Sequence, residues 1–420
     1  MEKQLFVKHR EEFIKHMKEG SFAIFYSGDA PHKTNDQTYV YEPNRNFYYL
    51  TGCERPNFIL LLVKGSSFAQ AFLFIEEPSD YATKWLGRRL TKQEVSDLSG
   101  LDLKQIKFVE EFKAFIHTAV LANSRGALLK KPEKLYLDLY KFKPFATPYS
   151  LTQLEFLTDA YPEILIESAN DVLDSMRKIK SQEEVAEIEK AISYGRIGIE
   201  AVLKFAKPGV NERELEAYYE YQIKMAGSKG ISFDSIVASG KNGTILHYID
   251  NFSEVKEGSL VLLDLGAKNG LYSSDISRTF PINGKFSERQ KQIYEIVLNT
   301  NKKIIEMVKP GVMVNDLNLS AKKMLMEEAK KIGLIKEDHE IDKYYYHGVS
   351  HYLGLDTHDV GTYQEPLQAG VVLTVEPGFY IEEEGIGIRI EDNVLVTETG
   401  RRNLSESIKK EWIDIENLMK

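Results

Sequence analysis

The chain lacks the features of a secreted, membrane-spanning or thiol-dependent protein. It has one cysteine, Cys53, in 420 residues, which excludes an internal disulfide framework and a zinc site made of paired cysteines. A protein so poor in cysteine fits a reducing compartment, and we expect it in the cytoplasm. Residues Met1–Lys8 are polar and mixed in charge, unlike a secretory signal, and apolar runs such as Phe58–Val63 are too short to cross a bilayer.

The chain also has fewer positively charged residues than negatively charged ones. The 54 lysines and arginines are outnumbered by 63 aspartates and glutamates, which gives a net charge of −9. This balance argues against nucleic acid or an anionic membrane as a partner. Hydrophobic residues at 43% and charged residues at 28% are ordinary for a globular protein. A length of 420 residues suits two domains, and we predict them at 1–172 and 173–420.

The first domain is predicted to be mixed α/β, because β-rich runs alternate with helical ones. We expect strands at Ser21–Tyr26, Phe58–Val63, Ala69–Ile75 and Lys134–Leu139, and helical structure at Val95–Leu101 and Glu110–Leu121. This part of the sequence contains no ligand cluster or nucleophile motif that we recognise.

Two capping patterns predict helix starts in the second domain. Ser181 is followed three residues later by Glu184, and Ser287 is followed in the same way by Gln290. In each pair the two side chains can accept hydrogen bonds from the free N–H groups of the first helical turn.

The second domain also carries a faint internal repeat. Lys207-Pro-Gly-Val210 recurs as Lys309-Pro-Gly-Val312, and the apolar run Gly258–Asp264 recurs as Gly370–Glu376, each ending on an acid. We interpret the repeat as a duplication in which two similar halves each deliver an acid to a shared cleft. Short self-similarities also arise by chance, so a chance match stays open as the alternative.

Five residues of the second domain are predicted to form one metal site: Asp264, Asp275, His351, Glu376 and Glu391. Four carboxylates and one imidazole make an oxygen-rich site that suits two hard or borderline divalent ions. Two ions held close together can activate one water for hydrolysis. A hydrolase with a dinuclear centre is therefore the hypothesis that these residues suggest.

A hairpin is expected to bring two of the acids together. Asp264 ends an apolar strand, where a buried carboxylate is costly unless it is paired or binds a metal. Asn269-Gly270 is a strong turn signal between Asp264 and Asp275 and would place them on neighbouring strands. Two ordinary alternatives stay open, namely a strand-end Asp264 paired with an arginine or lysine, and Asp275 paired with Arg278.

Glu376 and Glu391 are expected at the mouths of two further strands. Pro377 and Gly378 end a strand directly after Glu376. A period of two puts Arg389 on the same strand face as Glu391, with isoleucines on the opposite face. The alternative for Glu391 is a surface ion pair with Arg389, which would contribute little stability.

Three of the nine histidines, His347, His351 and His358, fall close together in the sequence. A lone histidine is usually structural, but a group of three near paired acids is typical of a metal or catalytic site. Gly348 and Gly354 disfavour a long helix here, and the HExxH motif of helical zinc peptidases is absent from the sequence.

Taken together, these motifs resemble the aminopeptidase P and prolidase family of metallopeptidases. The matching segments are Leu263–Gly266, Ser274–Phe280, His347–Asp359, Thr374–Gly378 and Ile388–Asp392, with weaker matches to aminopeptidase P at Asn46–Gly52 and Trp85–Arg89. The resemblance implies an α/β (α+β) architecture, in which a pita-bread catalytic domain with an internal pseudo-twofold duplication follows a creatinase-like mixed α/β domain. Thr357 departs from the family, which usually has isoleucine or valine there, but its β-branched shape is similar.

Carried over to this sequence, the resemblance implies a role for each ligand. Asp264 would bind one ion. Asp275 and Glu391 would bridge both ions, and His351 and Glu376 would complete the second. A hydroxide bridging the ions would attack the carbonyl of an Xaa-Pro bond, with Glu376 acting as general base and then as general acid.

Further residues are expected to act on the substrate. His358 would stabilise the developing oxyanion. His247 and His347 would line the proline side of the pocket. The predicted catalytic set is therefore Glu376, His358, His247 and Arg389.

The resemblance also implies residues that support the site from outside. Arg389 would orient Glu391, with Tyr380 and Asp36 as its further partners. Trp85 would reach the substrate site of a neighbouring subunit, which implies a homodimer or a dimer of dimers.

The function expected from the resemblance is that of a metal-dependent Xaa-Pro aminopeptidase, which releases the first residue from peptides with proline in second place. Two divalent ions, with Mn²⁺ as first choice, are the expected cofactors. Prolidase, which cuts Xaa-Pro dipeptides, is the alternative. The loop Thr362–Leu367 is short and lacks an arginine that some members have, which leaves recognition of a dipeptide carboxylate open. A non-catalytic binding module of the same fold is the distant alternative.

Overall fold

The computed structural model describes residues 2–121, 126–129 and 132–420. The chain divides into two compact units, Met1–Arg177 and Lys178–Lys420. Helix α8 (Asn170–Lys178) runs across the boundary predicted after residue 172, and that boundary stays a sequence-based prediction. Within the ranges given above, no helix combines the length and the apolar character needed to cross a membrane.

The N-terminal unit is built on a six-stranded mixed sheet in the order β6-β5-β4-β1-β7-β8. Its strands are β1 (Ser21–Tyr26), β4 (Ile59–Lys64), β5 (Ala69–Ile75), β6 (Ile106–Phe108), β7 (Lys134–Leu137) and β8 (Leu165–Ser168), and β2 (His32–Thr34) pairs with β3 (Gln37–Thr38) in a separate hairpin. Besides α8, its helices are α1 (Lys3–His16), α2 (Arg45–Thr51), α3 (Asp80–Leu86), α4 (Lys92–Ser99), α5 (Phe112–Phe115), α6 (Tyr149–Thr152) and α7 (Glu155–Thr158), with short turns η1 (Leu103–Gln105), η2 (Val109–Glu111) and η3 (Ile116–Val120).

The expected elements of this unit are confirmed, with small shifts at their ends. β4 lies inside the sheet and is a continuous apolar run because both of its faces are buried. The predicted helical stretch Glu110–Leu121 forms three consecutive short pieces, η2, α5 and η3, rather than one helix. This unit is a mixed α/β domain, as the sequence indicated.

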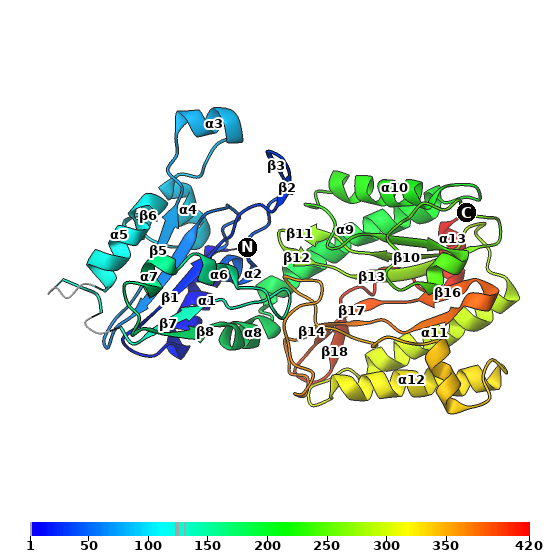
Figure 1. Ribbon diagram of the computed structural model, residues 1–420. Helices are drawn as coiled ribbons and strands as arrows, with labels where there is room; N and C mark the ends of the chain where they lie inside the picture. The colour runs from blue at the N-terminus through cyan, green and yellow to red at the C-terminus, as the bar shows by residue number, and fades with distance from the viewer. Residues whose placement is uncertain (1, 122–125, 130–131) are drawn as a thin grey trace. The chain divides into compact units, whose positions relative to one another are not determined.

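The C-terminal unit combines two pairs of long helices with antiparallel strands. Its helices are α9 (Gln182–Phe205), α10 (Glu212–Met225), α11 (Glu288–Met307), α12 (Val314–Lys331) and α13 (Trp412–Leu418), with turns η4 (Gly240–Thr244), η5 (Asp338–Lys343) and η6 (Glu382–Glu384). Its strands are β9 (Ile236–Ser239), β10 (Leu260–Leu265), β11 (Lys268–Asn269), β12 (Tyr272–Ser273), β13 (Ile276–Pro281), β14 (Val372–Val375), β15 (Gly378–Ile381), β16 (Ile386–Arg389), β17 (Asp392–Val396) and β18 (Arg401–Asn403). The two larger sheets run β13-β10-β9 and β14-β17-β18. In Figure 1, the green pair α9 and α10 lies on one side of these strands and the yellow pair α11 and α12 on the other.

The internal repeat occupies equivalent places in the two halves of this unit. Lys207–Val210 joins α9 to α10, and Lys309–Val312 joins α11 to α12. The glycine of each segment has a positive φ, 85° in the first and 88° in the second, which glycine adopts at little cost. β10 contains Asp264, and Glu376 directly follows β14. The expected pseudo-twofold duplication is confirmed.

Both predicted helix caps are present. Ser181 Oγ accepts from Glu184 N at 3.2 Å, and Glu184 Oε2 accepts from Ser181 N at 2.8 Å. Ser287 and Gln290 make the same reciprocal pair at 3.2 and 2.9 Å. These caps fix where α9 and α11 begin, so that one long helix of each half starts at a position defined by its local sequence.

Candidate metal centre

Antiparallel pairing of β10 with β13 brings the first two acids together. Asp264 lies opposite Ser277, and Asp275 directly precedes β13. The hairpin predicted at Asn269-Gly270 is confirmed, since β11 and β12 pair across this turn. The alternative for Asp275, an ion pair with Arg278, is wrong. Arg278 forms its ion pair with the carboxylate of Asp392 instead, at 2.9 Å.

Pairing of β14 with β17 brings the other two acids together. Glu376 comes just after β14 and Glu391 just before β17, at the end where these two strands are in register. The chain around His351 runs along the other edge of β14, where Thr374 N donates to His351 O at 2.9 Å. One imidazole and two glutamates therefore meet at the same strand end.

The predicted site residues of the C-terminal unit line one cavity of about 350 Å³. Its wall contains Asp264, Asp275, Glu376, Glu391, His247, His347, His351, His358 and Arg389, together with Leu246, Gly348, Ser350 and Tyr363. Tyr380 is buried next to this wall, with its hydroxyl 2.8 Å from His347 Nε2. Asp36 and Trp85 belong to the N-terminal unit, where both are exposed, and their roles stay predictions.

Asp275, His351 and Glu391 form the tightest group, in which one ligand atom of each lies within 4.8 Å of the other two. His351 Nε2 is also 3.4 Å from a carboxylate oxygen of Asp275 and 3.4 Å from one of Glu376. The other ring nitrogen, Nδ1, lies 3.0 Å from the carbonyl oxygen of Tyr352. Because that oxygen can only accept, Nδ1 carries the proton in the neutral ring and Nε2 presents a lone pair to the acids, as in a metal-ligating histidine.

Two buried carboxylate oxygens, Asp275 Oδ1 and Glu391 Oε1, have no hydrogen-bond partner among the residues that the structure describes. An unsatisfied buried polar atom costs about 1–3 kcal/mol, and native proteins contain few of them. Burial raises the pKa of both carboxyls well above their usual range, and neighbouring acids add to the rise. Burial also raises the pKa of Glu376. The donor set fits divalent cations, which supply both the missing partners and the compensating charge.

Arg389 is held in the cavity wall by three side chains. It donates from Nη2 to Asp264 Oδ2 at 2.7 Å, from Nη1 to the Tyr380 hydroxyl at 3.0 Å and from Nε to Ser277 Oγ at 2.8 Å. Ser277 Oγ lies 2.8 Å from Glu391 Oε2, so the expected link from Arg389 to Glu391 runs through this serine. The surface ion pair considered for Glu391 is wrong, because both residues are buried and Arg389 pairs with Asp264.

His347 is neutral and has both ring nitrogens engaged. Burial lowers its pKa to about 4, and the charge of Arg389 adds to this effect. Nδ1 lies 2.7 Å from Gly348 O and therefore donates, while Nε2 accepts from the Tyr380 hydroxyl at 2.8 Å. Since Tyr380 in turn accepts from Arg389, the chain of hydrogen bonds runs in one direction and fixes the tautomer of His347.

His358 packs edge-on against His351, with ring centroids 4.3 Å apart. Burial lowers the pKa of His358, and His351 and His247 contribute to the same direction. The next residue, Asp359, forms a fully buried ion pair with Lys180 at 2.9 Å, which anchors the chain beside His358.

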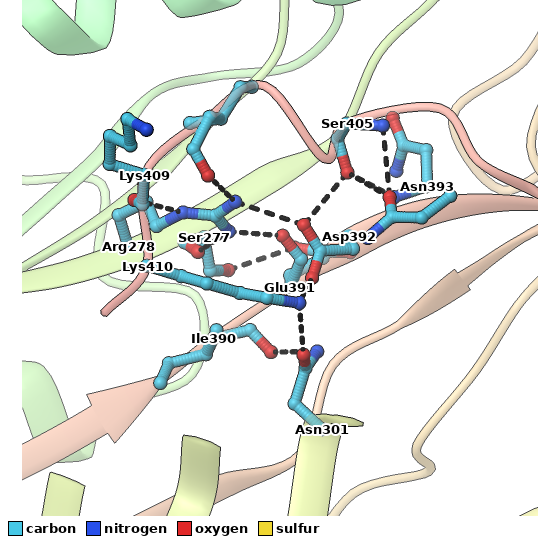
Figure 2. A network of polar contacts seen from close by, with 12 residues as sticks. Ser277, Arg278, Asn301, Ile390, Glu391, Asp392, Asn393, Ser405, Lys409 and Lys410 are labelled. Carbon is cyan, nitrogen blue, oxygen red and sulfur yellow. Dashed lines mark hydrogen bonds and ion pairs between the residues drawn. The ribbon is translucent and has the colours of Figure 1, made fainter. Parts of the chain in front are cut away.

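The sequence did not predict the residues that fix the backbone of the proposed ligands without being ligands themselves. Asn393 brackets the backbone of Asp275, because its Oδ1 accepts from Asp275 N at 3.2 Å and its Nδ2 donates to Asp275 O at 2.6 Å. Arg278 donates from Nη1 to Glu391 O at 2.5 Å and from Nη2 to Asp392 Oδ1 at 2.9 Å (Figure 2). The one available signal was that Arg278 lies within a matched segment and that Asn393 directly follows another.

Comparison with known proteins identifies the family. Metallopeptidase family M24 matches residues 186–398, slightly more than half of the chain. The chain belongs to this family. The N-terminal domain of aminopeptidase P matches residues 6–128 in addition. A divalent metal is thus the cofactor that family membership implies, in agreement with the donor set of the cavity.

Relatives match over the full length. A Xaa-Pro aminopeptidase from Haemophilus influenzae is 34% identical over 436 residues, covering 99% of this chain and 97% of its own. The Xaa-Pro aminopeptidase of Escherichia coli is 31% identical over 443 residues, covering 99% and 98%. The solved structure of Escherichia coli aminopeptidase P with the inhibitor Pro-Leu has a TM-score of 0.90 at 32% identity and covers 100% of this chain and 98% of that one. The pita-bread architecture expected from the sequence is confirmed.

Replacing Glu391 by glutamine should abolish metal binding and stabilise the metal-free protein. A carboxyl whose pKa is raised by folding contributes stability below its unfolded pKa of about 4.3, and this contribution is lost as the pH rises through the folded value. The melting temperature of chelator-treated Glu391→Gln should therefore exceed that of the unchanged protein at pH 8, by roughly 2–4 °C for each 1 kcal/mol, and the gap should shrink toward pH 5.

Glu398→Gln, at an exposed glutamate, is the matched control and should leave both melting temperatures unchanged. Added Mn²⁺ should raise the melting temperature of the unchanged protein and of the control, but not that of Glu391→Gln. A metal-free Glu391→Gln protein that melts lower at pH 8 would contradict the assignment of Glu391 to a repulsive acid cluster.

Proposed function

We propose that this metallopeptidase is a Xaa-Pro aminopeptidase, which removes the first residue from peptides with proline in second place. The observation that carries the proposal is a pair of buried oxygens, Asp275 Oδ1 and Glu391 Oε1, which have no hydrogen-bond partner among the described residues. They lie in a cavity lined by four acids and four histidines. The names of the full-length relatives support the choice of substrate. Cys53, which is free and buried, suits a reducing compartment such as the cytoplasm.

Two divalent ions, Mn²⁺ by first choice, are the proposed cofactors. Asp264 would hold one ion, Asp275 and Glu391 would lie between the two, and the second would be completed by His351 and Glu376. When bound, the ions supply Lewis acidity, which polarises a carbonyl and makes water a better nucleophile near neutral pH. The Nε2 lone pair of His351, fixed by the bond from Nδ1 to Tyr352 O, supports its role as a ligand.

The chain's own groups would handle the protons and the charge of the reaction. Glu376 would take a proton from the attacking water and then give it to the proline nitrogen as the bond breaks. Burial lowers the pKa of His358, which favours its neutral ring. His358 would donate an N–H to the oxyanion that forms on the scissile carbonyl.

His247 and His347 would enclose the proline ring. The bond before proline is a tertiary amide with no N–H to donate. His347 is suited to such a group, because its N–H is already given to Gly348 O and its second nitrogen already accepts from Tyr380. The wall therefore offers the substrate ring surface at this point rather than a free hydrogen-bonding atom.

Hydrolysis of an Xaa-Pro-Yaa tripeptide by the Mn²⁺-loaded protein is the direct test. We expect release of the first residue, and loss of this activity with a chelator because the acids then have no cations to position. An Xaa-Ala-Yaa tripeptide serves as the matched control and should be cleaved far more slowly. Cleavage of an Xaa-Pro dipeptide alone would indicate a prolidase instead. Failure to cleave either peptide with Mn²⁺ bound would favour a binding module.

Replacing His358 by alanine should lower kcat without preventing metal binding. Loss of one oxyanion donor typically reduces kcat by about 10²–10³-fold. His32, an exposed histidine of the N-terminal unit, gives the control variant His32→Ala, which should behave like the unchanged protein. The assignment would be wrong if His358→Ala kept its kcat at saturating Mn²⁺ and lost only affinity for the metal.

The surface of α3 supports a homodimer or a dimer of dimers. Trp85 is 72% exposed and lies beside Tyr81 and Leu86, which are 76% and 81% exposed. Neighbouring large apolar side chains left in water are typical of contact surfaces. We propose that Trp85 reaches the substrate site of another copy of the chain.

Sedimentation velocity should therefore detect a dimer or a larger assembly, and Trp85→Ala should lower kcat/KM for a tripeptide several-fold. Tyr140 is 68% exposed elsewhere in the same unit, and Tyr140→Ala should leave kcat/KM unchanged. A monomer with full activity in both variants would refute the proposed contact.

A further inference from the structure

One buried amide joins the two strand ends that carry the glutamates of the site. Asn301 lies on α11 and is fully buried. Its Nδ2 donates to Val375 O at 2.9 Å and to Ile390 O at 3.1 Å. Each of these carbonyls belongs to the residue directly before a proposed ligand, Glu376 in one case and Glu391 in the other. The amide therefore spans the gap between the two ligand-bearing backbones.

Lys410 determines which way this amide faces. Its Nζ donates to Asn301 Oδ1 at 2.8 Å, so that the NH₂ group of the amide is turned toward the two carbonyls (Figure 2). The opposite orientation would set Oδ1 against two carbonyl oxygens and the NH₂ group against an ammonium, with no donor facing an acceptor. Lys410 thus acts on the strand ends through Asn301.

The same lysine belongs to a buried ionic cluster beside Glu391. Lys410 Nζ also donates to Asp392 Oδ2 at 2.5 Å, and Arg278 donates to Asp392 Oδ1 at 2.9 Å. Burial alone would raise the pKa of Asp392, but the two cations hold it at about 2, so the carboxylate stays charged. The cluster fixes the residue after Glu391, while Asn301 fixes the residue before it.

The C-terminal segment is drawn into this cluster. Arg278 donates to Ile408 O at 2.9 Å and to Lys409 O at 3.0 Å, and Ser405 Oγ donates to Asp392 Oδ1 at 2.8 Å. Residues 405–410 therefore pack as part of the scaffold of the cavity, although they lie beyond the last predicted ligand in the sequence.

We infer that Asn301 and Lys410 are positioning residues of the metal centre, which set the spacing between Glu376 and Glu391. The inference rests on the proposed function, because it takes both glutamates to be ligands. Neither positioning residue lines the cavity. Asn301 donates to the two backbone carbonyls, and Lys410 acts on them through Asn301. The acids of the cavity repel one another in the absence of metal, and a donor shared by both strand ends resists their separation. Outer contacts of this kind typically change metal affinity by about 10–100-fold when they are removed.

The test uses the full chain, stripped of metal with a chelator and then titrated with Mn²⁺. Asn301→Leu keeps the side-chain volume and removes the amide, whereas Lys410→Met keeps the length and removes the ammonium. Thr300→Val is the matched control, because Thr300 is the adjacent buried residue of α11 and its hydroxyl bonds only Ile296 O within the helix in the part of the chain described. Lys410→Arg restores a cation at the same place.

We expect Asn301→Leu and Lys410→Met to raise the Kd for Mn²⁺ by about 10–100-fold. Their kcat should recover when Mn²⁺ is saturating, and Lys410→Arg should recover part of the affinity. Thr300→Val should keep the Kd of the unchanged protein even where it lowers the melting temperature. The side chain of Lys410 is 16% exposed. If Asn301→Leu does not fold, the Kd of Lys410→Met decides the test.

The inference is overturned if both variants lower the melting temperature as Thr300→Val does while the Kd for Mn²⁺ stays unchanged, since the contacts are then structural alone. Its failure is distinguishable from failure of the proposed function. Absence of Mn²⁺ binding by the unchanged protein, or unchanged binding by Glu391→Gln, would overturn the proposed metal centre and the inference with it.

Discussion

Repulsion among four carboxylates in one cavity is the constraint that shapes the C-terminal unit. The same cavity is lined by Asp264, Asp275, Glu376 and Glu391. Burial removes water that would otherwise screen the repulsion between their charges. Burial raises the pKa of Asp275 and Glu391, and the neighbouring acids add to the rise. The ion pair between Arg389 and Asp264, at 2.7 Å, offsets only part of this repulsion. The backbone around each acid has to be fixed by groups outside the cavity.

Those outside groups cross between the two halves of the duplication. Asn393, from the second half, brackets the backbone of Asp275, which belongs to the first. Arg278, from the first half, donates to the carbonyl of Glu391 in the second. Each half therefore secures a ligand that the other contributes, and neither half forms the cavity alone. Metal binding and the docking of the two halves are consequently linked, because cations relieve the repulsion that opposes docking.

The acids of the cavity were predictable because each lies where its local sequence makes an ionised side chain costly. Asp264 stands in an apolar strand, and Glu376 stands before a proline and a glycine that end one. Local reasoning could offer Arg278 only one partner, Asp275, as the alternative to a metal site. Side chains three residues apart on a strand point to opposite faces of the sheet. Arg278 instead donates to the carboxylate of Asp392, which lies 114 residues away in the sequence.

The positioning groups were beyond sequence reasoning for a related reason. An asparagine within a helix and a lysine in a C-terminal segment have no periodic or motif signal, and their contact joins positions 109 residues apart. Only the packed fold gives such residues a common function. The same holds for Ser277, whose hydroxyl connects Arg389 with Glu391 although serine is among the least informative residues of a strand.

Under the proposed function, selection for proline follows partly from what the cavity wall cannot accept. Both nitrogens of His347 are occupied, by Gly348 O on one side and the Tyr380 hydroxyl on the other. A secondary amide placed against this ring would bury an N–H without an acceptor, at a cost of about 1–3 kcal/mol. Each 1.4 kcal/mol corresponds to about tenfold in affinity. A tertiary amide carries no such N–H, so the chain of bonds from Arg389 through Tyr380 to His347 disfavours ordinary peptides without adding a hydrogen bond to proline.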